Sequence, residues 1–351
     1  MTLRFEKQTV VARIVSPSGE AVERPVEVRV NPVTGRTSRI TFSRSKEKER
    51  GGGGLPGPPP DASQTDSCPF CRPQLERLTP RLPLEQFGAE RLVRGKSVLF
   101  PNLFPYGGYS AVSLFGDEHF VEIGTATAAS YTDSLLNSRD YLCRVMETDA
   151  RAVYVAITQN HLPSAGGSLV HPHLQVHADP FPGNHLHLLL QKTAAHYAEG
   201  GTDLLSDLLA LERSEQVRYL GATGAWEWVA AYAPEGFYEL WAIMPGVRSF
   251  RDVADAQWAA LARGIVAAQK FYRSLGRNGY NLGLLAAETA DSRLELRLSI
   301  LVRANYAPWV RNDHTGYEVM LGDMATFTAP EETARLARAF WAQKGERGIG
   351  K

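Results

Sequence analysis

The alternation of apolar and polar positions along the chain predicts several β-strands. Residues 26–30 read Val-Glu-Val-Arg-Val, and residues 37–42 alternate in the same way after a turn at residues 31–35, so the two runs predict a hairpin. The other strand-like runs are residues 97–100, 110–115, 152–158, 226–232, 239–244 and 292–302. Their period of two is typical of sheets that bury one face.

Three stretches have the spacing of helices. One helix is predicted over residues 126–149. The last of the three begins at residues 328–331, Thr-Ala-Pro-Glu, which is a capping-box pattern with proline just inside the start. Between them, apolar residues at intervals of three and four predict a helix through Trp258, Leu261, Ile265, Ala268 and Tyr272. The mixture predicts an α+β fold with two similar halves, each an antiparallel sheet with packed helices.

Residues 45–66 are predicted to form a disordered insertion. They run from a charged stretch through four glycines to a proline-rich stretch, and this composition cannot bury enough apolar area to fold. The insertion lies inside the first of two predicted domains, which cover residues 1–195 and residues 196–351.

Composition and charge narrow the class of protein. The chain has 351 residues, of which 44% are hydrophobic, and its 38 lysines and arginines balance 38 acidic residues. This balance gives no overall field that would attract nucleic acid or an anionic membrane. No apolar run reaches the roughly 18 residues of a membrane span, and the first residues lack the apolar core of a signal peptide. We therefore expect a cytoplasmic protein that acts on small molecules.

The three cysteines are too few for a disulfide framework. Cys68 and Cys71 form a Cys-x-x-Cys pair, which is either half of a metal site or a redox dithiol. Redox pairs usually open a helix after a strand, whereas this pair follows the insertion and precedes Arg72 and Pro73, so a metal site is favoured. Cys143 lies in a predicted helix and is expected to be a buried apolar residue.

Residues 171–175, His-Pro-His-Leu-Gln, carry the densest chemistry. In a strand, His171, His173 and Gln175 project from one face, where one histidine can bind a metal while the next attacks an electrophile. The alternative is a pair of structural histidines. His177 is predicted to lie at the exposed end of the same strand.

The segment that leads into these histidines carries a resemblance. Asn160, Gly166, Ser168, the His-Pro-His run and Gln175 have the spacing of the active-site signature of galactose-1-phosphate uridylyltransferases, a branch of the histidine-triad superfamily, and the chain resembles that family. The resemblance is dense at residues 160–175 and thin in the second half. It also includes residues 29–35, Cys68 and Cys71, residues 100–104, residues 116–119, residues 316–318 and residues 328–331.

The resemblance implies roles for individual residues. It implies that His173 is the nucleophile, with Gln175 and Ser168 as its catalytic partners. One structural zinc is implied, bound by Cys68, Cys71, His119 and His171. The implied substrate-binding residues are Arg29, Phe100, Asn102, Asn160, Gly166, Tyr317 and Glu318.

The implied activity is nucleotidyl transfer. The family moves UMP from a nucleoside diphosphate sugar to a sugar 1-phosphate through a covalent nucleotidyl-histidine, with ping-pong kinetics, in galactose metabolism. The implied architecture is two histidine-triad-like halves in a homodimer, in which Tyr317 and Glu318 reach the neighbouring subunit's active site. Gln175 cannot protonate a leaving group as a third histidine would, which suits transfer between similar leaving groups.

The chain departs from the family at a second metal site that some members have. Arg297 and Ser299 stand where two of its histidines would be, and Leu189 and Leu285 occupy the other two positions. We therefore expect no second metal.

The substrate segments also depart from the family pattern. Leu103 replaces an acidic residue of the nucleoside segment, and Asn312 and Met324 replace a lysine and a glutamine of the sugar segment. These changes keep two alternatives open. One is a nucleoside diphosphate sugar phosphorylase or adenylyltransferase with a different acceptor, and the other is a non-catalytic, zinc-stabilised nucleotide-sugar-binding protein.

Overall fold

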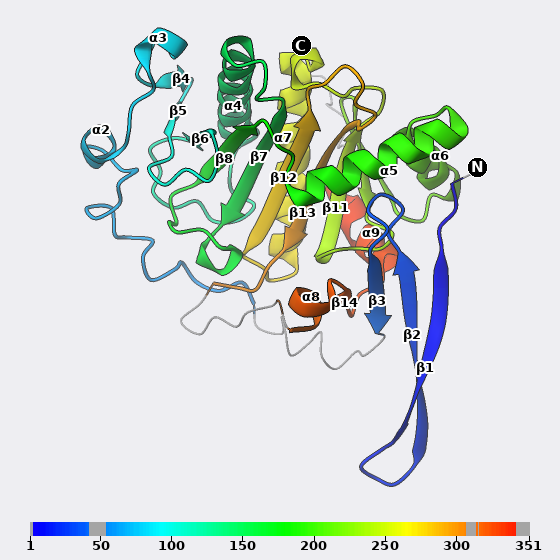
Figure 1. Cartoon of the computed structure of the whole chain (residues 1–351). Helices are drawn as coiled ribbons and strands as arrows, with labels where there is room; N and C mark the ends of the chain where they lie inside the picture. Colours follow the sequence, from blue (N-terminus) through cyan, green and yellow to red (C-terminus); the bar gives the residue numbers. More distant parts are fainter. Residues whose placement is uncertain (1–2, 42–53, 307–313, 315, 342–351) are drawn as a thin grey trace, which may run out of the picture.

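The computed structural model describes residues 3–41, 54–306, 314 and 316–341, and its architecture is α+β, as predicted (Figure 1). Its larger sheet is antiparallel throughout the described residues. The strands of this sheet lie in the spatial order β4 (Leu92–Arg94), β5 (Ser97–Pro101), β6 (Tyr109–Leu114), β8 (His173–Asp179), β7 (Tyr154–His161), β12 (Tyr280–Ala287), β13 (Leu296–Val302), β11 (Phe237–Met244), β10 (Trp226–Ala230) and β9 (Tyr219–Thr223). The predicted strands are therefore confirmed, and the two halves share one continuous sheet because β7 pairs with β12.

Long helices cover both faces of this sheet. On one face α4 (Ala128–Thr148) and α7 (Asp255–Ser274) pack against each other and against the main apolar core, as the helical spacing predicted. On the other face α5 (Asn184–Gly200) and α6 (Leu204–Glu215) cover β10 and β11. The shorter helices are α2 (Gln74–Leu78), α3 (Leu84–Phe87), α8 (Gly316–Leu321) and α9 (Pro330–Ala337), with 3-10 turns at Pro163–Ala165, Phe250–Asp252 and Arg338–Phe340.

The central strands show why one face of the sheet is available for chemistry. Along β7 the residues alternate, so that Val155 and Ile157 enter the main core while Thr158 and Asn160 point to the opposite face. That opposite face is only half-buried on β7, β8 and β12, because α5 and α6 do not extend over all of it. The polar residues of the strands therefore meet there.

A smaller sheet has the order β1 (Lys7–Val15), β2 (Ala21–Val30), β3 (Thr37–Thr41) and β14 (Met324–Thr326). The pairing of β2 with β3 confirms the predicted hairpin. The sequence reasoning missed β1, whose nine residues are all exposed. In Figure 1 the β1–β2 ribbon projects away from the rest of the molecule.

Two predictions, the disordered insertion at residues 45–66 and the capping box at residues 328–331, differ from the structure where it describes them. Residues 45–53 lie outside the described residues, whereas residues 54–66 form a series of turns. Helix α9 begins as predicted with proline in its first turn, but its N-cap is Ala329 and no side chain caps it. The capping-box prediction was wrong because Glu331 binds Arg29 and Arg218 instead. Among the described helices, none is both long and apolar enough to cross a membrane.

Candidate active site and metal centre

Four side chains from distant parts of the chain converge on one point. Cys68, Cys71, His119 and His171 place one ligand atom each within 4.8 Å of one another. The Sγ atom of Cys71 is 3.3 Å from Nδ1 of His119 and 3.5 Å from Nδ1 of His171. Two thiols and two imidazoles at these separations fit a tetrahedral metal site, so the cluster could bind a metal ion.

The contacts around the cluster favour metal binding. Nε2 of His171 lies 3.0 Å from the Gly116 carbonyl, and Nε2 of His119 lies 3.0 Å from the Asp61 carbonyl. A carbonyl only accepts, so each Nε2 carries the proton and each Nδ1 lone pair faces the two thiols. Burial and the nearby Cys68 raise the pKa of the Cys71 thiol to about 12, so a thiolate there requires a cation.

His173 follows two residues later on β8, on the same face of the strand as Gln175. Its Nδ1 lies 2.7 Å from the main-chain carbonyl of His171, which fixes the proton on Nδ1 and leaves the Nε2 lone pair free. The ring is 5% exposed and meets the edge of Phe70 at 5.3 Å between centroids. Burial lowers the pKa of His173, although its hydrogen bond to the His171 carbonyl opposes that shift. The imidazole is therefore neutral and nucleophilic near pH 7.

Neighbouring strands align their polar residues beside His173. Gln175 is paired with Thr158 on β7, Thr158 with Gly283 on β12, and Gly283 with Ser299 on β13. Paired residues in an antiparallel sheet point to the same face, so these residues form a row across the open part of the sheet. A Cβ atom added at Gly283 would have only Thr158 Cγ2 nearby, at 4.0 Å, so the row borders open space.

Asn160 lies on the same open face, and sequence reasoning missed its main partner, Asn281 of β12. Nδ2 of Asn281 donates to Oδ1 of Asn160 at 2.7 Å and to the Ala165 carbonyl at 2.8 Å. The polar position in the alternating run Tyr-Asn-Leu-Gly-Leu at residues 280–284 was the available signal. This strand was absent from the sequence prediction.

The glycine-rich loop connects Asn160 to His173. A Cβ atom at Gly167 would lie 2.9 Å from the Asn160 carbonyl, so the loop folds back closely on β7. Gly166 has a left-handed backbone with φ of 89°, which turns the chain at this point. Ser168 is exposed on the loop, and its hydroxyl has no hydrogen-bond partner among the described residues.

The other predicted substrate-binding residues are more dispersed. Phe100 is 1% exposed and packs beneath Phe70, in an apolar cluster beside His173. Asn102 accepts a hydrogen bond from the amide of Phe104 at 3.2 Å. The side chain of Tyr317 lies outside the described residues. Glu318 is half-buried at the start of α8.

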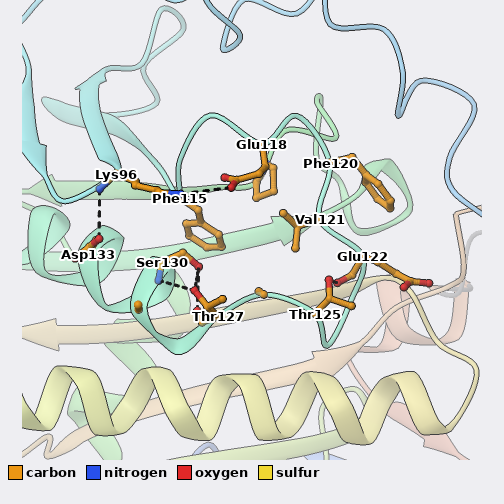
Figure 2. Close-up of a pocket in the computed structure, with 13 residues that line it drawn as sticks. Lys96, Phe115, Glu118, Phe120, Val121, Glu122, Thr125, Thr127, Ser130 and Asp133 are labelled. Carbon is orange, nitrogen blue, oxygen red and sulfur yellow. Dashed lines mark hydrogen bonds and ion pairs between the residues drawn. The ribbon is translucent and has the colours of Figure 1, made fainter.

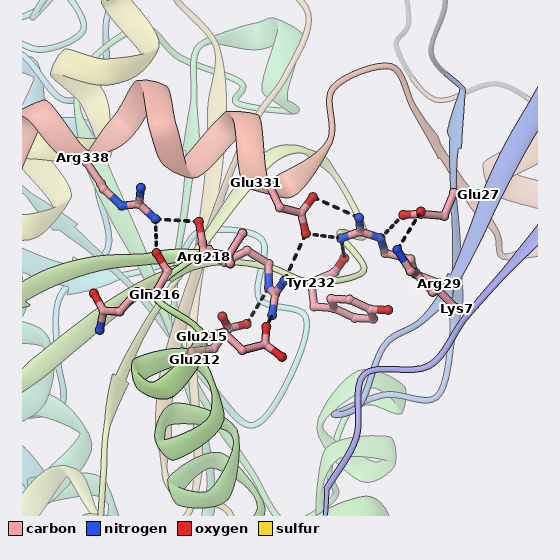
Figure 3. A network of polar contacts seen from close by, with 11 residues as sticks. Lys7, Glu27, Arg29, Glu212, Glu215, Gln216, Arg218, Tyr232, Glu331 and Arg338 are labelled. Carbon is pink, nitrogen blue, oxygen red and sulfur yellow. Dashed lines mark hydrogen bonds and ion pairs between the residues drawn. The ribbon is translucent and has the colours of Figure 1, made fainter.

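Arg29 lies in a network of ion pairs (Figure 3). Its guanidinium donates two hydrogen bonds to Glu331, at 2.8 and 3.0 Å, and one to Glu27 at 2.5 Å. Arg218 donates to the same Glu331 carboxylate at 3.0 Å. No contact among the described residues joins this network to His173, so a role for Arg29 in substrate binding stays a prediction.

His177 differs from its sequence prediction. It lies within β8 rather than at an exposed end, half-buried on the same face as His173 and Gln175. Burial lowers the pKa of His177, although the Asp179 carboxylate opposes that shift. The strand continues because Ser110 of β6 and Ala156 of β7 pair with His177 on both sides.

Arg297 and Ser299, the two residues from which we expect no second metal, lie on β13. Arg297 is 7% exposed, lies over the Trp241 ring at 4.5 Å, and approaches Nε2 of His185 at 3.4 Å. Ser299 donates to Glu239 at 2.6 Å. A buried cation therefore lies on the same face of the sheet as Gln175.

A separate hollow of about 530 Å³ is lined by Glu118, which precedes His119 in the sequence, and by other residues drawn in Figure 2. It contacts Pro172, the residue between the two histidines, but none of the predicted site residues lines it. Its walls come mainly from residues 115–130, together with Lys96 and Asp133. The hollow is therefore distinct from the open face that carries His173.

Several solved structures share the fold of this chain. An ADP-glucose phosphorylase from Arabidopsis thaliana, solved with bound ADP-glucose, matches with a TM-score of 0.69 and 20% identity over 89% of this chain and 98% of that chain. A uridylyltransferase matches with a TM-score of 0.64 and 19% identity, over the same shares of the two chains. The fold is that of the galactose-1-phosphate uridylyltransferase family, as the sequence resemblance predicted.

The sequence itself has a closer relative. The chain is 30% identical, over 345 residues, to an uncharacterized protein of Archaeoglobus fulgidus, and the match covers 97% of this chain and all of that protein. The chain belongs to the same family as this archaeal protein. No protein-family model matches the chain.

Proposed function

We propose that the chain is a nucleotidyltransferase that moves a nucleoside monophosphate from a nucleoside diphosphate sugar to a sugar 1-phosphate. The hydrogen bond from Nδ1 of His173 to the His171 carbonyl is the observation that carries the proposal, because it leaves Nε2 as the nucleophile. The open face beside it bears Asn160 and Gln175, whose amides can donate to phosphate oxygens. The likeness in fold to a uridylyltransferase and an ADP-glucose phosphorylase supports this activity.

The reaction takes place in two displacements. Nε2 of His173 attacks the α-phosphorus of the donor, a nitrogen–phosphorus bond forms, and the bond to the β-phosphate oxygen breaks, which releases the sugar 1-phosphate. The Nδ1 proton, held by the His171 carbonyl, stabilises the positive ring that results. A phosphate oxygen of the acceptor then attacks the phosphorus, and the nitrogen–phosphorus bond breaks, which restores His173.

Neutral donors complete the site. A neutral imidazole adds no negative charge to a phosphorus that is already shielded by anionic oxygens. Gln175 can hydrogen-bond those oxygens but cannot supply a proton, and a sugar phosphate needs none in order to leave. Ser168, on the exposed loop, is the third proposed donor.

We propose zinc as the metal of the Cys68, Cys71, His119 and His171 cluster. Two cysteines and two histidines are a preferred zinc set, and four protein ligands leave no position for water, which makes the site structural. The metal would tie the loop that bears Cys68 to the strand that bears His173. It would thereby hold the nucleophile in place without taking part in the transfer.

The remaining features of the proposal come from the resemblance. They are a uridylyl donor, a role in galactose metabolism, a cytoplasmic location, and a homodimer in which Tyr317 and Glu318 complete the neighbouring subunit's sugar pocket. The substrate-binding roles of Arg29, Phe100, Asn102, Asn160 and Gly166 belong to the same proposal.

Mass spectrometry of the intact protein tests the proposal. The protein is incubated separately with UDP-glucose, UDP-galactose, ADP-glucose and GDP-mannose, and its mass is measured. We expect one nucleoside monophosphate per chain from the true donor, absent in His173→Asn and present in His187→Asn, a change on the outer part of α5. A protein that binds a nucleotide sugar without gaining mass would instead be a binding protein.

A phosphorylase is the second candidate. Leu103, which stands where the family has an acidic residue, is exposed, and the chain shares its fold with a phosphorylase of ADP-glucose. In that reaction inorganic phosphate attacks adenylyl-His173 and releases ADP. Mixing the labelled protein with inorganic phosphate or with glucose 1-phosphate distinguishes the candidates, because only the true acceptor removes the label rapidly.

A further inference from the structure

We propose that Arg303 and Asn281 are positioning residues that fix the amide of Asn160 with its NH₂ group toward the substrate. The inference deepens the proposed function and rests on it. Three hydrogen bonds carry it. NH1 of Arg303 donates to Oδ1 of Asn281 at 2.8 Å, Nδ2 of Asn281 donates to Oδ1 of Asn160 at 2.7 Å, and the same Nδ2 donates to the Ala165 carbonyl at 2.8 Å.

We call the hydrogen bonds from Arg303 through Asn281 to Asn160 the relay. The direction of each bond in the relay follows from which atoms can donate and which can only accept. A guanidinium can only donate, so the atom of Asn281 that faces Arg303 is its carbonyl oxygen. The main-chain carbonyl of Ala165 can only accept, so the atom of Asn281 on that side is its nitrogen. The atom of Asn160 that faces this nitrogen must therefore be oxygen. A side-chain amide that could otherwise flip is fixed at both ends.

The consequence falls on the free end of Asn160. With Oδ1 engaged, its NH₂ group is the part left to bind a ligand, and this group has no hydrogen-bond partner among the described residues. Asn160 lies on the open face that holds Gln175 and His173. A flipped amide would present an oxygen to an anionic phosphate and repel it, so the relay ensures that a donor faces the phosphoryl oxygens.

The cation at the far end strengthens the relay. Each amide is polarised by the donor behind it, and such chains reinforce their members in a site of low dielectric. Arg303 thus acts on the phosphate through two amides rather than by direct contact. The bond to the Ala165 carbonyl also anchors the glycine-rich loop, so Asn281 places the loop and the Asn160 donor together.

A double-mutant cycle tests the inference. We measure the rate at which the true donor labels His173 in a single turnover, for the wild type, Asn160→Ala, Asn281→Ala and the double variant. We expect each single change to slow labelling by roughly 10- to 100-fold, in keeping with the loss of one preorganised donor. In the Asn160→Ala background the second change should have less than about a threefold effect, because its target is gone. Effects that multiply in full would overturn the inference.

Two further variants separate positioning from general structure. Asn278→Ala removes a nearby asparagine that binds the Tyr306 carbonyl and has no contact with Asn160, so its effect should multiply with that of Asn160→Ala. Arg303→Lys keeps a single donor for Asn281 and should retain most of the labelling rate, whereas Arg303→Met should lose it about tenfold. Equal losses in the two Arg303 variants would contradict the relay. Thermal melting checks that each variant is folded.

Equilibrium binding distinguishes failure of this inference from failure of the proposed function. Binding of UMP and AMP is measured by calorimetry for the wild type and for Asn281→Asp, which can accept from Arg303 but cannot donate to Asn160. We expect roughly tenfold weaker binding by the variant. If the wild type binds a nucleotide but is never labelled, the proposed function fails. The relay is then judged by the ratio of the dissociation constants of Asn281→Asp and the wild type. An unchanged ratio, or a wild type that binds neither nucleotide, overturns the relay.

Discussion

On β7 and β8, the face of the sheet that carries His173 is half-buried, and its side-chain amides have NH₂ groups without a partner among the described residues. On β11 and β13, the same face is packed beneath α5 and α6. The pairing register makes the two regions comparable, because Gln175 and Trp241 lie in one row across the sheet. In the first region the side chain of Gln175 has no hydrogen-bond partner among the described residues. In the second, Trp241 is 1% exposed and donates to Glu239 at 2.6 Å.

The two regions differ in whether their polar side chains have hydrogen-bond partners. The buried Glu239 carboxylate accepts from Trp241, Ser299 and the amide of Glu235, and Arg297 lies close enough to offset its charge. Such a group is satisfied and has little left for a ligand. Around His173, the amide NH₂ groups of Asn160 and Gln175 have no partner among the described residues and both side chains are partly exposed, which suits them to bind an anionic ligand. The face on β7 and β8, called the reactive region below, is thus suited to binding a substrate. The same face on β11 and β13, called the packed region, is suited to stabilising the fold.

The largest expected effect tests the reactive region. Replacement of His173 by Asn keeps the strand but removes the nucleophile, and we expect labelling by the true donor to fall by about 10⁴-fold or more. Single-turnover labelling with a radioactive donor measures the loss. The matched change His185→Asn, beside Arg297 in the packed region, should leave the rate within about threefold. Comparable losses at both histidines would remove the distinction between the two regions.

Much of the reactive region could be predicted from the sequence because its chemistry is local. His173 and Gln175 lie on one face of β8, as period two predicts, and His171 lies in the bend directly before this strand. The convergence of Cys68 and His119 on His171 came from the resemblance, since no periodicity relates residues so far apart. Asn281 was missed because its role depends on β12 pairing with β7, a long-range contact that the sequence does not display.

The small sheet and its junction with the large sheet were less predictable for physical reasons. Strand β1 pairs with β2 in a projecting ribbon, and none of its residues is buried. Its sequence therefore carries no pattern of buried and exposed positions. The pattern at residues 328–331 is locally correct for a capping box, yet Glu331 forms ion pairs with Arg29 and Arg218, which come from distant segments. Tertiary ion pairs thus overrode a local motif, and local sequence could not reveal this.

The second prediction concerns the metal that supports the reactive region. We expect one divalent metal per chain in the wild type and none in Cys71→Ser, because the thiolate is needed to bind it. Loss of the metal should lower the free energy of unfolding by on the order of 4 kcal/mol. Metal content by plasma mass spectrometry and urea unfolding measure the two effects. Cys143→Ser, which changes a cysteine outside the cluster, should keep both values, and metal retained by Cys71→Ser would contradict the assignment.

The third prediction concerns the packed region. Arg297→Met leaves the Glu239 carboxylate buried without its nearby cation, and we expect a loss of about 3 kcal/mol in the free energy of unfolding with no loss of labelling rate. Adding Glu239→Gln should recover at least half of that loss, because the uncompensated charge is removed. Urea unfolding of the single and double variants makes the comparison. A fall in labelling rate with unchanged stability would place Arg297 in the reactive region instead.

The smallest expected effect concerns the ion pairs that join the small sheet to the packed end of the large sheet. Burial disfavours ionisation of Glu331, but its hydrogen bonds to Arg29 and Arg218 more than offset this and hold its pKa below the ordinary value of 4.5. Because the pKa is lower in the folded state, the stabilisation is fully present above pH 4.5 and is lost as the pH falls through the lowered value. We expect Glu331→Gln to cost about 1–2 kcal/mol at pH 7 and progressively less below pH 4.5. Urea unfolding between pH 3 and pH 8 measures this. Glu332→Gln is the control, since among the described residues Glu332 pairs only with the exposed Arg335 and should contribute little. A Glu331→Gln deficit that grew as the pH fell would have the wrong sign for a carboxylate held ionised by two arginines.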